Sequence, residues 1–254
     1  MRKRSKIILG MAFIAVFVLF RLFVCVKYTI LTGSMLPTIN VGESVHVFKL
    51  LYGWRLYNYK SSHQDSFYRI YGIRGIEPGD VIVFNVPFVG NNYERIVFNQ
   101  DVAYCKRVLG CPGDRIGTVD GHCWNDRVLR PIGVVGEQEK LRWMFDGFFR
   151  MTDSFDVIPF LESGWNIKNW GPLIVPAAGM TMTLDDFTRE LYRQVIEYET
   201  GKALEDTVTE YTFRGNYYFA VGDNAMSSFD SRYWGFIPED FIIGIVCGKR
   251  FRNK

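Results

Sequence analysis

A serine stands in a short segment whose residue types suit covalent chemistry. In Thr32-Gly33-Ser34-Met35-Leu36-Pro37-Thr38, Ser34 lies between a glycine and an apolar residue, and a Pro-Thr turn follows. A serine hydroxyl is a weak nucleophile until a neighbouring base takes its proton. The chain must therefore supply a base if Ser34 is to react.

The three histidines do not stand in a recognisable catalytic motif. His46 falls in an expected strand, His63 in an irregular stretch and His122 in a tight turn. Structural or surface roles explain these three positions.

Lys106 is the better candidate for the base. In a strand running from Val102 to Val108, the two-residue period puts Lys106 on one face with Tyr104 and Val108. Loss of hydration on an apolar face lowers a lysine pKa. A fall of roughly three units, worth about 4 kcal/mol, would leave the amine available near neutral pH. Serine–lysine pairs are a known variant of the nucleophile–base arrangement.

The segments that must position these residues predict a mainly β protein. Short apolar runs rich in β-branched residues, bounded by turn residues, are typical of strands. A single soluble helix is predicted from Asp185 to Glu199, because Phe187, Leu191 and Val195 share a face and Gly201 can end it. The predicted strands cover residues 41–48, 81–86, 102–108, 217–221 and 241–246.

Two stretches depart from this pattern. Residues 51–76 are aromatic and basic without a clear period, and we interpret them as a long loop. From residue 116 to 214 the composition shifts, and Asp120-Gly121 favours a hairpin turn. We predict that 116–214 is an inserted cap domain on a catalytic β core formed by 28–115 and 215–254.

The N-terminus reads as a membrane anchor. The apolar run from Ile7 to Val26 would span about 30 Å as a helix, enough to cross a bilayer. Residues 1–6 are strongly basic, which predicts a cytoplasmic start, a transmembrane helix over 7–27 and an external remainder. A cleavable signal is the alternative, but the run is long and no small-x-small site follows it before Ser34.

Composition narrows the function further. The 254 residues are 48% hydrophobic and 16% aromatic with a net charge of +3, which excludes a disordered chain and gives no nucleic-acid-binding surface. The five cysteines lack the spacing of a zinc site, so we expect no metal and no cofactor. A Cys111–Cys123 bridge stays open if the domain faces an oxidising compartment.

Three blocks together resemble type I signal peptidase, the membrane-bound serine–lysine protease family. Gly33-Ser34-Met35-Leu36-Pro37-Thr38 resembles its nucleophile block. Lys106-Arg107-Val108-Leu109-Gly110-Cys111-Pro112-Gly113-Asp114 resembles its lysine block. Gly222-Asp223-Asn224, then Ser228, then Asp230-Ser231-Arg232-Tyr233-Trp234-Gly235 resembles its third block. The order of the blocks and the upstream apolar run also agree, and the family has an antiparallel β-sheet core.

The resemblance implies a role for each matching residue. Ser34 would be the nucleophile, Lys106 the general base, and Ser228 the residue that orients the lysine. The oxyanion hole would use the Ser34 backbone N–H and the Thr32 hydroxyl, where the family commonly has serine. The remaining charged residues of the blocks would form a supporting set of ion pairs: Asp223, Asp230, Arg107 and Arg232.

The family binds its substrate as an added strand and prefers small residues one and three positions before the cut. The adjoining residues would line those pockets: Ile30, Met35, Tyr104 and Cys105. Cys105 is atypical beside the base, and could change the size of the pocket or make it sensitive to thiol reagents.

The expected function is cleavage of signal peptides from exported precursors by a monomer in the bacterial cytoplasmic membrane, with its catalytic domain on the periplasmic side. Its partners would be precursor proteins and the lipid bilayer, with no nucleic acid. One alternative is a specialised relative that matures a dedicated substrate, such as a pilin or conjugation protein. A non-catalytic secretion scaffold would show a degenerate block, and a self-cleaving repressor would carry a DNA-binding domain in place of the apolar run.

Overall fold

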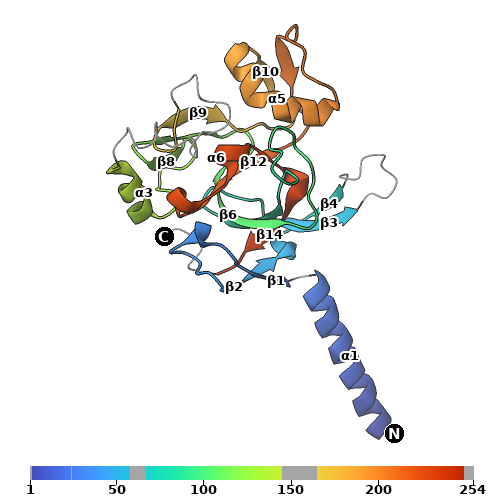
Figure 1. Ribbon diagram of the computed structural model, residues 1–254. Helices are drawn as coiled ribbons and strands as arrows, with labels where there is room; N and C mark the ends of the chain where they lie inside the picture. The colour runs from blue at the N-terminus through green and yellow to red at the C-terminus, as the bar shows by residue number, and fades with distance from the viewer. Residues whose placement is uncertain (1, 24, 58–66, 145–164, 249–254) are drawn as a thin grey trace.

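The computed structural model describes residues 2–23, 25–57, 67–144 and 165–248. Its centre is an antiparallel 7-stranded sheet in the order β1-β2-β14-β5-β6-β12-β13 (Figure 1). The strands of this sheet are β1 (Cys25–Thr29), β2 (Ser44–Phe48), β5 (Val81–Asn85), β6 (Ala103–Gly110), β12 (Tyr217–Val221), β13 (Ile237–Pro238) and β14 (Ile242–Val246). The prediction of a mainly β protein is confirmed.

Apolar side chains cover both faces of the middle of this sheet. Alternate residues of β5 enter two different clusters, with Ile82 and Phe84 on one face and Val81 and Val83 on the other. All five residues of β5 are buried. A strand buried on both faces needs a continuous apolar run, which is the pattern that made β5, β12 and β14 visible in the sequence.

The second strand starts later than predicted. Residues 41–43 form a turn in which Gly42 has a φ of 79° and Glu43 N–H donates to the Asn40 carbonyl at 3.1 Å. A positive φ at Gly42 is incompatible with an extended strand, so β2 begins only at Ser44.

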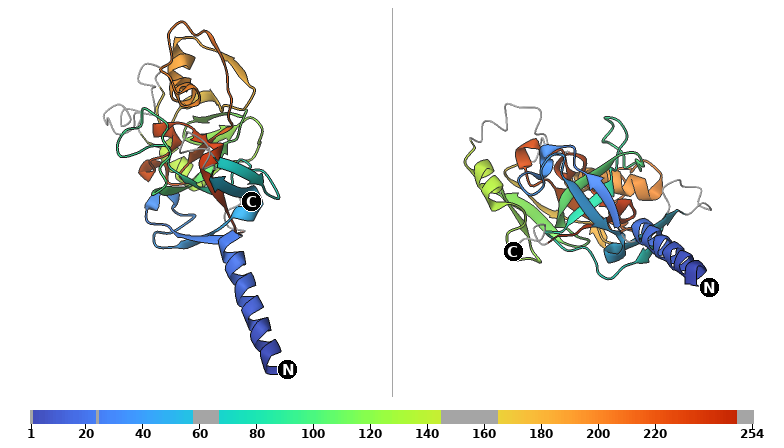
Figure 2. Two further views of the ribbon diagram at one scale, coloured as in Figure 1. Left: turned by 90° about the vertical axis from the view of Figure 1, so that its right-hand side faces the viewer. Right: turned by 90° about the horizontal axis from the view of Figure 1, so that it is seen from below.

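The first helix also differs from its predicted range. Helix α1 (Arg2–Phe23) begins before residue 7 and ends before residue 27. Strand β1 follows at Cys25 because residues 25–29 pair in register with β2. Helix α1 projects away from the body of the protein (Figures 1 and 2). Within the described residues, no helix has both the length and the apolar character that crossing a membrane demands.

Helix α5 (Asp186–Thr200) begins at a capping box, in which Asp185 and Thr188 exchange hydrogen bonds, and ends at the left-handed Gly201. The expected hairpin turn has a φ of 48° at Asp120 and 80° at Gly121. The other elements are β7 (Arg115–Val119), β8 (His122–Asn125), α3 (Val135–Arg142), β9 (Trp170–Ile174), β10 (Thr181–Thr183) and β11 (Glu210–Thr212). Helix α5 and the strand β10 lie at the end of the molecule opposite α1, whereas α3 and β8 lie at the side of the central sheet (Figures 1 and 2).

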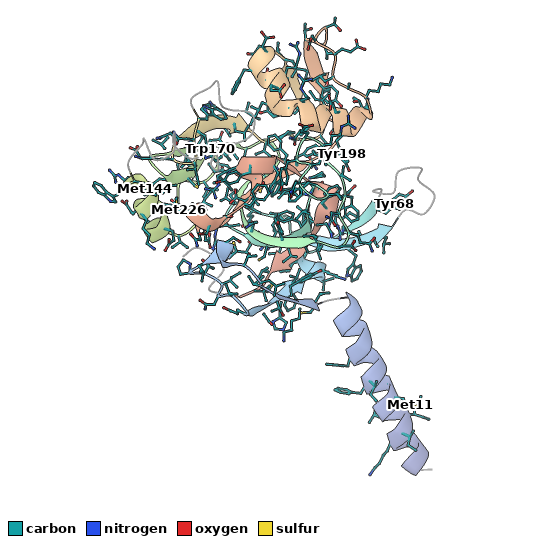
Figure 3. The ribbon with its side chains drawn as sticks, viewed as in Figure 1. Met11, Tyr68, Met144, Trp170, Tyr198 and Met226 are labelled. Atoms are coloured by element: carbon teal, nitrogen blue, oxygen red, sulfur yellow. The ribbon has the colours of Figure 1, made fainter. Side chains whose placement is uncertain are left out.

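The interpretation of residues 51–76 as a long loop is wrong. A short helix, α2 (Lys49–Tyr52), leads into a hairpin of β3 (Gly53–Tyr57) and β4 (Phe67–Tyr71), whereas residues 58–66 lie outside the described structure. Arg69 fastens β4 to the core by donating to the Ile242 carbonyl at 2.9 Å, and Tyr68 projects from the hairpin (Figure 3). The sequence pattern did not predict this strand, because an amphipathic strand normally has apolar residues on its inward face and here an arginine points inward.

Candidate active site

Ser34 lies in a short 3₁₀ turn, η1 (Gly33–Met35), just beyond the first strand. Ile30 fixes the approach to this turn by exchanging backbone hydrogen bonds with Glu43 and Gly42 at 2.8 and 2.7 Å. Met35 is fully buried beneath it. Asn224 N–H donates to the Ser34 carbonyl at 3.0 Å, so the turn is held from both sides.

Lys106 lies in β6, opposite Ile82 of β5. Its side chain is only 4% exposed. The ammonium Nζ donates a hydrogen bond to Ser228 Oγ at 3.0 Å and lies 5.5 Å from the centre of the Tyr104 ring. The strand therefore carries a lysine into the protein interior, with one hydrogen-bond partner in place.

Burial lowers the pKa of Lys106 from 10.5 to about 8. The Asp230 carboxylate partly opposes this fall, and the Arg232 guanidinium adds to it. A measurable share of the amine is therefore uncharged near neutral pH, as a general base requires.

Ser228 joins the lysine to a buried ion pair. Its hydroxyl donates to Asp230 Oδ2 at 2.5 Å, and Arg232 binds the same carboxylate through Nε and Nη2 at 2.8 and 2.6 Å. Burial alone would raise the pKa of Asp230, but the Arg232 charge holds it below its ordinary value. Since Asp230 stays ionised, it accepts a hydrogen bond from the Ser228 hydroxyl, whose oxygen in turn accepts one from Lys106.

A second ion pair joins all three sequence blocks. Arg107 binds Asp223 through Nε and Nη2 at 2.6 and 2.7 Å, and Nη1 donates to the Gly79 carbonyl at 2.8 Å. Thr38 Oγ1 donates to the same Asp223 carboxylate. The Ser34 turn, the Lys106 strand and the third block therefore meet at one buried carboxylate.

The close approach of the Ser34 turn and Ser228 explains why the third block begins with a glycine, Gly222. A Cβ on Gly222 would lie 2.1 Å from Ser228 Oγ and 2.6 Å from the Ser34 carbonyl oxygen. Any larger residue would push Ser228 and the Ser34 turn apart. The turn that follows, η3 (Ala225–Ser227), carries Met226, which packs beside α3 near Met144 (Figure 3).

Several of the predicted site residues line one pocket of about 340 Å³. Among the residues that line it are Ile30, Thr32, Ser34, Tyr104, Cys105 and Lys106. Met35 was predicted to line the pocket but is buried beneath it, in the cluster that contains Ile39. The four charged residues predicted as one set form two separate ion pairs.

The cysteines form no disulfide. All five are free, so the Cys111–Cys123 bridge does not form. Burial raises the pKa of Cys105 to about 12, which keeps its thiol protonated at neutral pH. Cys105 therefore presents a small apolar surface to the pocket.

Three residues with no predicted role also contribute. Thr38 binds Asp223, Asn224 holds the Ser34 turn, and Phe229 lines the pocket. Thr38 and Asn224 stand inside the quoted blocks, which is the signal that could have identified them.

Ser34 and Lys106 line the same pocket, and each has its own hydrogen-bond partner. Among the described residues, no hydrogen bond joins Lys106 Nζ to Ser34 Oγ, whereas Thr32 Oγ1 lies 3.4 Å from Ser34 Oγ. Catalytic hydrogen bonds are often long before substrate binds. A buried hydroxyl, an amine of lowered pKa and an open pocket are the components of a hydrolase that uses serine.

Comparison with known proteins gives the family. A family model described as "Signal peptidase, peptidase S26" matches residues 2–160 and 167–248. The chain belongs to this family, and the resemblance of the three blocks is confirmed. It is therefore a serine peptidase, a hydrolase.

Its relatives include signal peptidase I of Buchnera aphidicola subsp. Schizaphis graminum, 26% identical over 262 residues, with 95% of this chain and 72% of the relative covered. Signal peptidase I of Aquifex aeolicus is 27% identical over 228 residues, with 88% of this chain and 75% of the relative covered. The crystal structure of a signal peptidase I from Enterococcus faecalis is 17% identical with a TM-score of 0.34, and covers 69% of this chain and 100% of that chain.

Proposed function

We propose that this peptidase cleaves signal peptides from exported precursors, with Ser34 as nucleophile and Lys106 as general base. The observation that carries the proposal is that Lys106 has a buried amine of lowered pKa and lines the same pocket as Ser34. The family supports the reaction class, since its description names signal peptidase.

In the proposed reaction, Lys106 takes the Ser34 proton as Oγ attacks the carbonyl carbon before the cut. The Ser34 backbone N–H and the Thr32 hydroxyl donate to the developing oxyanion. The protonated lysine then gives its proton to the departing amine, which leaves an acyl group on Ser34. Lys106 next activates water, which releases the acyl group and restores the serine.

Ser228 acts as a positioning residue in this reaction. Its hydroxyl is tied to Asp230 at 2.5 Å, so its acceptor lone pair stays directed at Lys106. Because Asp223 and Asp230 are each occupied by an arginine, neither carboxylate competes for the catalytic lysine as a direct ion-pair partner. The Asp230 charge raises the pKa of Lys106, and the Arg232 charge that pairs with Asp230 lowers it.

The substrate would add to an open strand edge at the pocket. Residues 103–106 of β6 pair with β5 on one side, whereas the pairing with β12 begins only at Arg107. The second edge of residues 103–106 is therefore open to an extended peptide, which would complete the sheet. Ile30 and Cys105 offer small apolar surfaces for side chains at the −1 and −3 positions.

The proposed location is the bacterial cytoplasmic membrane, with the catalytic domain outside the cytoplasm as a single-pass monomer. Helix α1 supports this proposal because many of its apolar side chains are exposed, among them Ile7, Leu9 and Phe13 at 59, 73 and 73%. Such side chains on a projecting helix favour an apolar surrounding. Residues 1–6 carry the basic start expected on the cytoplasmic side.

The test is cleavage of a precursor panel by the full chain purified in detergent, with the cut sites mapped by mass spectrometry. We expect cuts after small residues at −3 and −1, and no cuts with Ser34→Ala. A panel in which one dedicated precursor alone is cut would favour the specialised relative. Intact precursors with the wild-type protein, or cuts that persist in Ser34→Ala, would refute the proposal.

A further inference from the structure

One aromatic residue in the pocket has no part in the chemistry described so far. Phe229 follows the lysine-orienting Ser228 directly, lines the same pocket as Ser34 and Lys106, and is 37% exposed. A large apolar side chain left partly exposed beside a reactive group is a candidate for contact with a ligand.

The Phe229 ring is supported from behind by other rings. Tyr93 packs against it edge-on, with centroids 4.9 Å apart, and Phe88 does so at 5.9 Å. Phe88 also packs against Tyr104, the second aromatic residue of the pocket, at 6.2 Å. Helix α5 fixes the support, since Gln194 Nε2 donates to the Tyr93 carbonyl at 2.8 Å. Phe229 and Tyr104 thus form an aromatic side of the pocket. Because other rings pack against them, they cannot move easily away from a substrate.

The position of Phe229 identifies the part of the substrate that it meets. The proposed oxyanion donor, Thr32, lies 3.4 Å from the nucleophile, whereas Lys106 is bonded to Ser228. The departing amine must receive its proton from Lys106, so the residue that follows the cut lies at the lysine end of the pocket. Phe229 is bonded in sequence to Ser228 at that end.

We propose that Phe229 limits the size of the side chain that directly follows the cut peptide bond. This inference rests on the proposed function, because it uses the roles of Ser34 and Lys106. Small residues fit between Phe229 and the lysine, whereas bulky ones meet a ring that Tyr93 and Phe88 hold in place. Phe229 is therefore a specificity-determining residue for the first position of the mature product.

The experiment uses the full chain in detergent and precursors that differ only in the residue after the cut, with alanine, leucine or tryptophan there. For the wild type, kcat/KM falls from alanine to tryptophan. Phe229→Ala reduces the ratio of the two kcat/KM values by about tenfold or more. Phe229→Trp raises this ratio of kcat/KM values. This variant tests the proposal independently if Phe229→Ala does not fold.

Two controls separate specificity from a general loosening of the site. Phe187→Ala removes another phenylalanine of similar exposure, 42%, on α5 and outside the pocket lining, and leaves the ratio unchanged. A second precursor series, varied at the residue before the cut, keeps its own ratio in Phe229→Ala. Equal relaxation in both series, or an unchanged ratio after the cut, overturns the inference.

The outcomes also separate this inference from the proposed function. If the wild type leaves every precursor intact, the proposed function fails and this inference fails with it. If the wild type cuts the alanine precursor and Ser34→Ala does not, while the Phe229 variants discriminate as the wild type does, only the role of Phe229 is refuted.

Discussion

Two pockets in this protein differ in what their charges do. The larger, about 410 Å³, lies between α5 and the third sequence block, and its wall includes Glu190, Arg193 and Glu197. Arg193 binds Glu190 at 2.8 Å on the helix surface, where both side chains are a third to a half exposed. The smaller pocket contains Lys106, which is 4% exposed and has a pKa lowered to about 8.

The comparison teaches that burial of a charge, and not the volume of a cavity, distinguishes the proposed active site. An exposed ion pair contributes little to stability. Burial of an amine lowers its pKa. The larger pocket therefore serves as an internal control for the smaller one, and each prediction below tests that contrast.

The largest expected effect comes from the two central residues. Ser34→Ala and Lys106→Ala should each reduce kcat by at least about 10⁴-fold, because nucleophile and base act as one unit. Glu190→Gln in the larger pocket should leave kcat within about twofold. The measurement is turnover of a purified precursor. A comparable loss in Glu190→Gln would break the contrast between the pockets.

A smaller loss should follow removal of the Thr32 hydroxyl. Thr32→Val should reduce kcat by about 10²–10³-fold with little change in KM, since the lost hydrogen bond forms only as the oxyanion develops. Thr32→Ser keeps the hydroxyl and should retain most of the activity. Full activity in Thr32→Val, or an equal loss in Thr32→Ser, would contradict a role for the hydroxyl alone.

The buried lysine should also weaken the fold at neutral pH. Its folded-state pKa lies below the unfolded value, so the unfolded chain binds more protons between about pH 8 and 10.5. Below pH 8 the charged lysine is destabilising by about 3 kcal/mol, and this penalty disappears as pH rises towards 10.5. Lys106→Met should therefore raise the free energy of unfolding at pH 7 and gain progressively less above pH 8. Urea titrations of both proteins at pH 7 and at about pH 10.5 test this. A gain in the free energy of unfolding that does not depend on pH would contradict it.

The smallest expected effect is that of Ser228→Ala. Loss of a hydrogen bond to a charged group should slow the reaction about tenfold. The wild-type kcat/KM should rise with pH around a midpoint near 8, as Lys106 loses its proton. In Ser228→Ala the ammonium form loses an acceptor, so the midpoint should move to lower pH. An unchanged pH profile would mean that Ser228 supports the fold alone.

Much of this site was readable from the sequence, because its residues stand in contiguous blocks. Strands such as β5 and β12 were found from their apolar runs. The pairing of Arg107 with Asp223 could not be deduced, because it depends on which strands become neighbours. Met35 was misplaced for a related reason: its proximity to Ser34 in the chain does not tell whether its side chain points into the pocket or beneath it.

The hairpin of β3 and β4 shows a different limit. Its inward contacts come from arginine, which donates to main-chain carbonyls, so the usual alternation of apolar and polar residues is lost. The end of α1 was predicted too late because the apolar character of the sequence continues into β1, and a hydrophobic run alone does not distinguish the two.

The place of β14 in the sheet bears on how a new copy of the protein matures. This strand inserts between β2, next to the nucleophile turn, and β5, next to the lysine strand. During synthesis both neighbours must wait with open edges until residues 242–246 arrive, which favours slow folding through distant contacts. A chain that lacks residues 242–246 leaves the edges of β2 and β5 unpaired, so the last strand to be synthesised completes the sheet that carries the Ser34 turn and the Lys106 strand.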